Sequence, residues 1–205
     1  LYTSRVVLNV LGVVDFGVYN VVSGIVVLFS FLNTALANSS QRFLSISIAG
    51  GSRTAVENTF SVCLFLHMAL AALILLLCET AGLYYVTNYL SVPQGKETLA
   101  IFAFHLAAAA TCMNVLRVPF YAVLISYENM SAVAYLSIAE ALLKLCGVLL
   151  LPHVPGEKLQ AYSVMLLVVY LLVLLSFMAV SIFRYRLRLR RVRDWKLFRE
   201  FTGFS

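Results

Sequence analysis

Four charged side chains lie inside long apolar segments of this sequence, namely Arg5, Arg117, Glu140 and Lys144. A charge at the centre of a membrane-spanning helix costs on the order of 2.5–3.5 kcal/mol, so it needs a partner or a water-filled cavity. An arginine guanidinium donates two parallel hydrogen bonds to phosphate or carboxylate groups. The three cations among them are therefore candidates for recognition of an anion within a membrane.

The spacing of the charges predicts which of them meet. Arg117 lies about 8 residues before the end of its apolar segment, and Glu140 lies about 8 residues into the next one. The polar break between the segments, 127–131, is short. We therefore expect Arg117 and Glu140 to lie at the same depth and to approach each other. Lys144 lies one helical turn beyond Glu140 on the same face.

Arg5, Asn9 and Asn33 complete the candidate substrate-binding set. Arg5 lies about 8 residues, or about 12 Å, from the polar break at Gly12–Asp15. No acidic residue is evident at its depth. Asn9 shares the face of Arg5 because it follows four residues later. Asn33 lies beside a stripe of small and polar residues in the second apolar segment.

Two interpretations of Arg117 and Glu140 stay open. The first is an ion pair that fixes the packing of two helices. The second is a cationic, hydrated cavity that receives an anionic head group, with Arg5 as its strongest candidate because it lacks an evident counter-charge.

Motifs for catalysis or metal binding are absent from the sequence. There is no phosphate-binding glycine loop, no metalloprotease helix motif and no nucleophile elbow. The four cysteines stand singly in apolar segments, as buried small residues do. We expect no enzyme, no catalytic residue, no metal and no cofactor, apart from H⁺ or Na⁺ as a coupling ion.

The composition points to an integral membrane protein. Of the 205 residues, 62% are hydrophobic and 12% are charged, whereas soluble domains have roughly 25% charged residues. So few charges cannot cover a surface that faces water. The net charge of +6 does not indicate nucleic acid, because the excess lies in one run at 184–199.

Apolar windows long enough to cross about 30 Å of hydrocarbon recur along the chain, the first of them cut short. They are 1–12, 16–40, 59–84, 98–125, 132–151 and 159–183. Each is continuous and lacks the alternation of barrel strands, which favours an all-α, polytopic transmembrane helix bundle.

Basic residues set the expected orientation. The run at 184–199 is hard to translocate, so the last span should end in the cytoplasm. Counting back places the loops 41–58 and 127–131 on the same side. We therefore predict a membrane domain at 1–183 and a basic cytoplasmic linker at 184–205, whose Trp195 and Phe198 fit either a short interfacial helix or a plain linker.

Two stretches of the sequence resemble a known family. They are SRVVLNVLGVVDFGVYNVV with the later SSQRFL, within 4–44, and LRVPFYAVLISYENMSAVAYLSIAEALLKL at 116–145. Both are similar to bacterial polysaccharide flippases, which belong to the multidrug and oligosaccharidyl-lipid exporter (MATE-like) superfamily.

The resemblance implies two six-helix lobes that face a central cavity and work by alternating access. This sequence would form the first lobe with its first helix truncated, and we expect it to be a piece of a longer protein. The implied substrate is undecaprenyl-pyrophosphate-linked oligosaccharide, flipped across the bacterial inner membrane for polysaccharide or lipopolysaccharide biosynthesis. Its implied partners are this substrate, membrane lipids and the second lobe. Matching position would make Arg5, Arg117, Glu140 and Lys144 cavity residues.

Two alternative functions are retained. A multidrug or metabolite cation antiporter of the same superfamily would prefer acidic groups in its cavity, and the excess of Arg and Lys in the spans argues against it. A non-transporting membrane scaffold would have its buried charges all mutually paired and no wet cavity.

Overall fold

The computed structural model describes residues 2–29, 32–90, 92 and 95–189. These residues are almost entirely helical and include no strand, which confirms the all-α prediction. Five of the described helices are long and apolar enough to cross a membrane. The chain therefore has the helices of a multi-pass membrane protein.

The elements follow one another along the chain as a series of long helices, with short helical turns between some of them. They are α1 (Tyr2–Phe29), α2 (Leu32–Ala49), α3 (Arg53–Leu77), the π-helical turn η1 (Cys78–Gly82), α4 (Leu83–Asn88), α5 (Glu97–Ser126), α6 (Met130–Leu150), the 3₁₀ turn η2 (Leu151–His153) and α7 (Lys158–Tyr185). The predicted span 59–84 corresponds to α3, η1 and the start of α4. The spans 98–125, 132–151 and 159–183 correspond to α5, α6 and α7, respectively.

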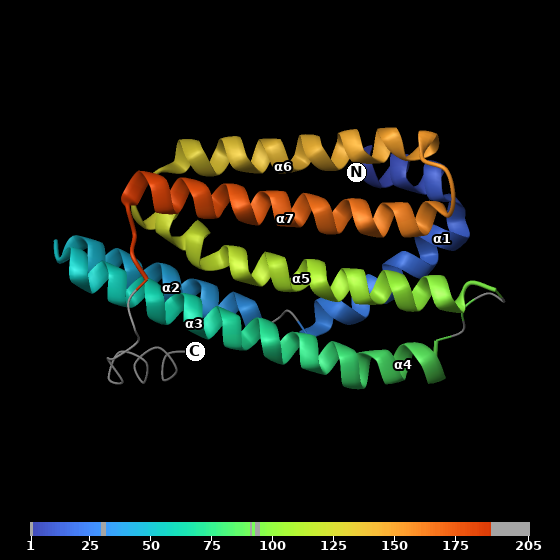
Figure 1. The fold of residues 1–205 in the computed structure, drawn as a ribbon, viewed down its shortest axis with the longest axis horizontal. Helices are drawn as coiled ribbons and strands as arrows, with labels where there is room; N and C mark the ends of the chain where they lie inside the picture. The colour runs from blue at the N-terminus through green and yellow to red at the C-terminus, as the bar shows by residue number, and fades with distance from the viewer. Residues whose placement is uncertain (1, 30–31, 91, 93–94, 190–205) are drawn as a thin grey trace.

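Gly12 breaks α1 into two segments that run in different directions (Figure 1). Its backbone angles, φ 80° and ψ 166°, lie in a region that essentially only glycine adopts. The predicted turn at Gly12–Asp15 is thus confirmed in position. The predicted span 16–40 is wrong in extent, because α1 ends at Phe29 and α2 continues to Ala49.

The predicted polar loop at 41–58 is also wrong in extent. Helix α2 ends at Ala49 and α3 begins at Arg53, so a tight turn joins them, with Ser52 accepting a hydrogen bond from the Ala55 N–H. Ser45 and Ser47 in this region bond to side chains of neighbouring helices instead of facing a loop. The Ser47 and Thr59 hydroxyls, for example, lie 2.7 Å apart.

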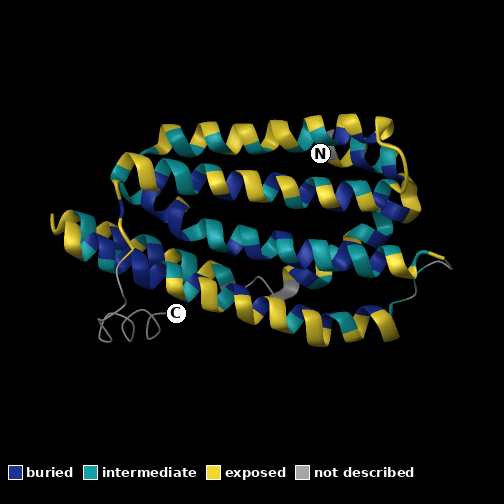
Figure 2. Ribbon diagram, viewed as in Figure 1, coloured by how far each residue is buried: buried dark blue, intermediate teal, exposed yellow. Residues whose placement is uncertain are grey.

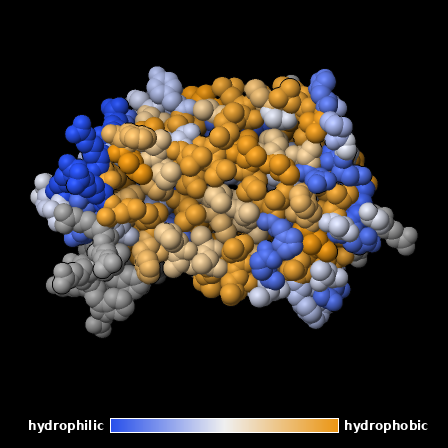
Figure 3. All heavy atoms as spheres, viewed as in Figure 1, coloured by the Kyte–Doolittle hydropathy of each residue, from blue (hydrophilic) through white to orange (hydrophobic). Residues whose placement is uncertain are grey.

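The connections alternate between the two ends of the bundle (Figure 1). Asp15, just after the break in α1, pairs with Lys96 before α5 and ties one end together. At the other end, the Asn129 amide donates to the Tyr185 hydroxyl at 3.0 Å. Hydropathy follows this arrangement, because an apolar middle separates the more hydrophilic ends (Figure 3). Which end faces the cytoplasm remains a prediction.

Helix α5 lies at the centre of the bundle and packs against α1, α2, α3 and α7. Its buried alanines, including Ala103, Ala107 and Ala108, let neighbouring helices approach closely. Helix α6 is peripheral and largely exposed (Figure 2), with Val148 as the buried residue among its described positions. The predicted linker 184–205 begins within α7, which ends at Tyr185, and from residue 190 onward it lies outside the described residues.

Candidate functional site

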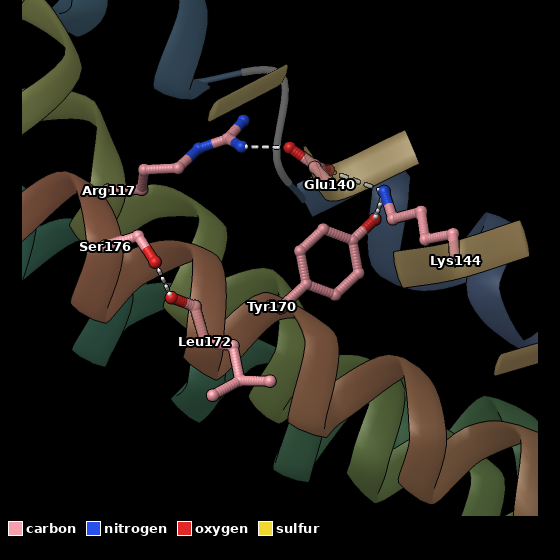
Figure 4. Close-up of polar contacts among 6 residues, drawn as sticks. All are labelled: Arg117, Glu140, Lys144, Tyr170, Leu172 and Ser176. Atoms are coloured by element: carbon pink, nitrogen blue, oxygen red, sulfur yellow. Dashed lines mark hydrogen bonds and ion pairs between the residues drawn. The ribbon is translucent and has the colours of Figure 1, made fainter. Parts of the chain in front are cut away.

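Glu140 on α6 lies between two cations (Figure 4). Its Oε2 accepts a hydrogen bond from Arg117 Nη1 on α5 at 2.6 Å. Its Oε1 accepts one from Lys144 Nζ, a turn further along α6, also at 2.6 Å. The predicted approach of Arg117 and Glu140 is therefore confirmed. We call Arg117, Glu140 and Lys144 the charged triad.

Aromatic side chains of α7 support both cations of the triad. Lys144 Nζ lies 4.5 Å from the ring centroid of Tyr170 and donates to its hydroxyl at 3.4 Å. The Arg117 guanidinium carbon lies 5.4 Å from the ring centroid of Phe177. Aromatic faces attract cations at such distances. The triad thus connects α5, α6 and α7.

The charged triad carries one positive charge in excess, because two cations share one carboxylate. Its side chains are also partly open: Arg117 is 23% exposed, Glu140 15% and Lys144 27%. A partly open site with a net positive charge can take up an anionic group through charge-assisted hydrogen bonds.

Arg5 and Asn9 do not join the triad by any polar contact. Both are exposed on the first segment of α1. Neither forms an ion pair or a side-chain hydrogen bond with the rest of the described chain. Their place in a binding site stays a prediction.

Asn33 lines a partly open cavity of about 280 Å³. The walls of this cavity come from α1, α2, α5 and α7. The Asn33 Oδ1 atom is buried and has no hydrogen-bond partner in the described part of the chain. Tyr170 lines the same cavity. Tyr170 therefore lies between the cavity and Lys144 of the charged triad.

Sequence reasoning missed several residues of this region. Tyr170 carries the hydroxyl in an otherwise apolar run at 165–175, and this was a signal that could have been used. Thr111 and Asn114 line the cavity and stand three residues apart in α5, on one helix face. Phe177 gave no signal, because a phenylalanine in an apolar helix is normally a packing residue.

A second polar pair lies away from the triad. His105 Nδ1 on α5 is 2.9 Å from Glu79 Oε1 in η1. Elsewhere in the bundle, His67 is buried, with Nδ1 2.8 Å from the Cys63 carbonyl. Among the described residues, no group of three or more His, Cys, Asp or Glu side chains is placed to hold a metal ion.

The described residues define a helical, multi-pass membrane protein with a charged site between three helices and a polar cavity beside it. Comparisons with protein-family models, with curated proteins and with solved structures found no match for this chain. The class of protein therefore follows from the helices and the site themselves.

Proposed function

We propose that the chain forms one lobe of a transporter that flips a pyrophosphate-linked oligosaccharide, carried on an undecaprenyl lipid, across the bacterial inner membrane. The observation that carries this proposal is the charged triad, with its excess positive charge and partial exposure between apolar helices. The resemblance of 4–44 and 116–145 to polysaccharide flippases supports the same assignment.

The triad gives this transporter a way to bind its substrate. In the absence of substrate, Glu140 holds the two cations and keeps α5 and α6 together. A pyrophosphate group offers several charged oxygens that compete with Glu140 for the donors of Arg117 and Lys144. Arg5, whose side chain is exposed, would attract the same group.

Binding at the triad would also favour one conformation of the lobe. The Arg117–Glu140 pair joins α5 to α6, and α6 packs loosely on the bundle. A pyrophosphate that takes over Arg117 weakens this connection, so α6 can shift. A ligand shifts a conformational equilibrium by its differential affinity for the two states. Rocking of two lobes around the bound substrate then follows as alternating access.

The test is a substitution of Lys144 in the complete protein, expressed in a bacterial strain that lacks its own copy. Lys144→Gln should lower surface polysaccharide at least tenfold while membrane abundance stays unchanged. Lys144→Arg is the matched control, because it keeps the charge, and it should retain most of the polysaccharide. Full polysaccharide in the Lys144→Gln strain would rule out the triad as the binding site.

One observation favours the scaffold alternative: both cations of the triad have a partner in Glu140. If the triad serves packing alone, Glu140→Gln should lower polysaccharide only in proportion to its loss of membrane abundance. A fall in polysaccharide that clearly exceeds the loss of abundance would favour transport.

A further inference from the structure

The cavity beside the triad is lined by neutral polar residues together with valines and alanines of α1 and α5. Hydroxyl or amide groups come from Tyr19, Asn33, Thr34, Thr111, Asn114 and Tyr170. Among the described residues that line it there is no Asp, Glu, Lys, Arg or His. Groups of this kind donate and accept hydrogen bonds but offer no counter-charge. The lining therefore suits a neutral ligand rich in hydroxyl groups.

The size of the cavity points to a ligand larger than water. Its volume of about 280 Å³ greatly exceeds the ~10–15 Å³ that admits one water molecule. It lies just below the range of about 300–1,000 Å³ that is usual for small-molecule pockets. A single sugar ring is a ligand of this size class.

An unused acceptor and a fixed wall support a built site. The buried Asn33 Oδ1 has no donor within the described part of the chain. A ligand hydroxyl can supply one once the Asn33 amide turns this oxygen toward the cavity. The Tyr19 ring packs edge-on against Tyr162, with ring centroids 4.8 Å apart, so this wall is held in place. Ser23, by contrast, already donates to the Tyr19 carbonyl at 2.7 Å.

Tyr170 places the cavity next to the charged triad. Its side chain lines the cavity, and its hydroxyl accepts a hydrogen bond from Lys144 Nζ at 3.4 Å. A ligand with a neutral ring bonded directly to an anionic group would reach from the cavity past the Tyr170 side chain to Lys144. We infer that the cavity binds one neutral sugar ring, the unit attached to the pyrophosphate of the substrate; the pyrophosphate link rests on the proposed function.

The experiment uses the complete protein, purified in detergent, with two kinds of probe. Methyl β-D-glucoside and N-acetylglucosamine report on the cavity through saturation-transfer NMR. Inorganic pyrophosphate reports on the triad through broadening of its ³¹P signal. Thr111→Val and Asn114→Leu remove hydrogen-bonding groups from the cavity at nearly constant size. Thr80→Val, in the exposed η1 turn, is the matched control.

The expected result is a saturation-transfer signal for at least one sugar in the wild type and in Thr80→Val. That signal should fall at least threefold in Thr111→Val and Asn114→Leu, while pyrophosphate broadening persists. Lys144→Gln should show the reverse pattern. Each variant is compared only if it elutes as a monodisperse species at the wild-type volume, and two independent cavity variants guard against misfolding of one.

Two outcomes would overturn the inference. One is the absence of a signal for both sugars in the wild type, and the other is a sugar signal that both cavity variants leave unchanged. A sugar signal that depends on the cavity, without any broadening of pyrophosphate, would support the sugar site but overturn the proposed function and the pyrophosphate link.

Discussion

The hydroxyl of Tyr170 lies 3.4 Å from Nζ of Lys144, and the same tyrosine lines the polar cavity. One side chain of α7 is thus shared between a cationic site and a neutral one. The Lys144 ammonium also lies 4.5 Å from the centre of the Tyr170 ring, so the tyrosine holds the lysine through two kinds of contact. Substitutions at Tyr170 can separate these contacts.

Tyr170→Phe keeps the ring under Lys144 but removes the hydroxyl. We expect a loss of about 0.5–1.5 kcal/mol in stability, at the low end because the hydrogen bond is long. Tyr170→Leu also removes the cation–π contact, which is worth about 0.5–2 kcal/mol more, depending on how far the site is desolvated. The thermal unfolding midpoint of the purified protein should therefore be highest for wild type, lower for Tyr170→Phe and lowest for Tyr170→Leu. Equal midpoints for Phe and Leu would mean that the ring contributes nothing.

Glu140→Gln leaves Arg117 and Lys144 close together without their counter-charge. Removing one partner of a buried ion pair costs about 3–5 kcal/mol, and we expect less here because the triad is partly open. The double variant Glu140→Gln/Lys144→Gln removes one of the two cations and should recover part of the loss.

A double-mutant cycle of the thermal unfolding midpoints checks this interaction. Coupling between positions 140 and 144 should be clear at low salt and smaller at high salt, since the triad is partly exposed. Additive effects of the two substitutions would show that Glu140 does not compensate the lysine.

Some of the site could be predicted because short loops fix relative depth. The break at 127–131 is only a few residues long, so residues equally far from it along the chain are expected at the same depth. Arg117 and Glu140 fit this expectation, because Arg117 Nη1 lies 2.6 Å from Glu140 Oε2. Depth does not determine which way a side chain faces. That is why Arg5, placed by depth alone, remains without a polar contact in the described chain.

Polarity alone misled the prediction of the loop at 41–58. Serine and threonine between apolar segments resemble a loop in sequence, but in this bundle they bond across helices, as Ser45 does to Ser126 at 3.1 Å. The cavity was missed for a related reason, because Thr111 and Asn114 stand in a helix that is mostly apolar. Only the packing of four helices shows that such residues face one space.

At Gly147, helix α6 lies against the Met165 side chain of α7. A Cβ built at this position would lie 2.6 Å from the Sδ atom of Met165. Gly147→Ala therefore requires the flexible methionine to move, and overpacking of this kind typically costs about 1–3 kcal/mol. The second substitution Met165→Ala should relieve the clash. Thermal unfolding of the single and double variants checks this, and a Gly147→Ala protein as stable as wild type would show that Met165 yields freely.

Gly12 offers a test of backbone geometry without any change in packing. A Cβ at Gly12 would meet nothing within 4 Å, so its effect comes from the backbone angles alone. With φ 80° and ψ 166°, Gly12→Ala should destabilise the protein by about 1–3 kcal/mol.

Gly17 and Gly24 are matched controls, since they lie in the helical part of α1 and a Cβ there also meets nothing within 4 Å. Alanine at either control should stabilise the protein by roughly 0.5–1 kcal/mol, because glycine is a poor helix former. Opposite shifts in the unfolding midpoint at position 12 and at the controls would establish that the break at Gly12 is set by the backbone, whereas stabilisation at all three positions would mean that the two segments of α1 join as one continuous helix.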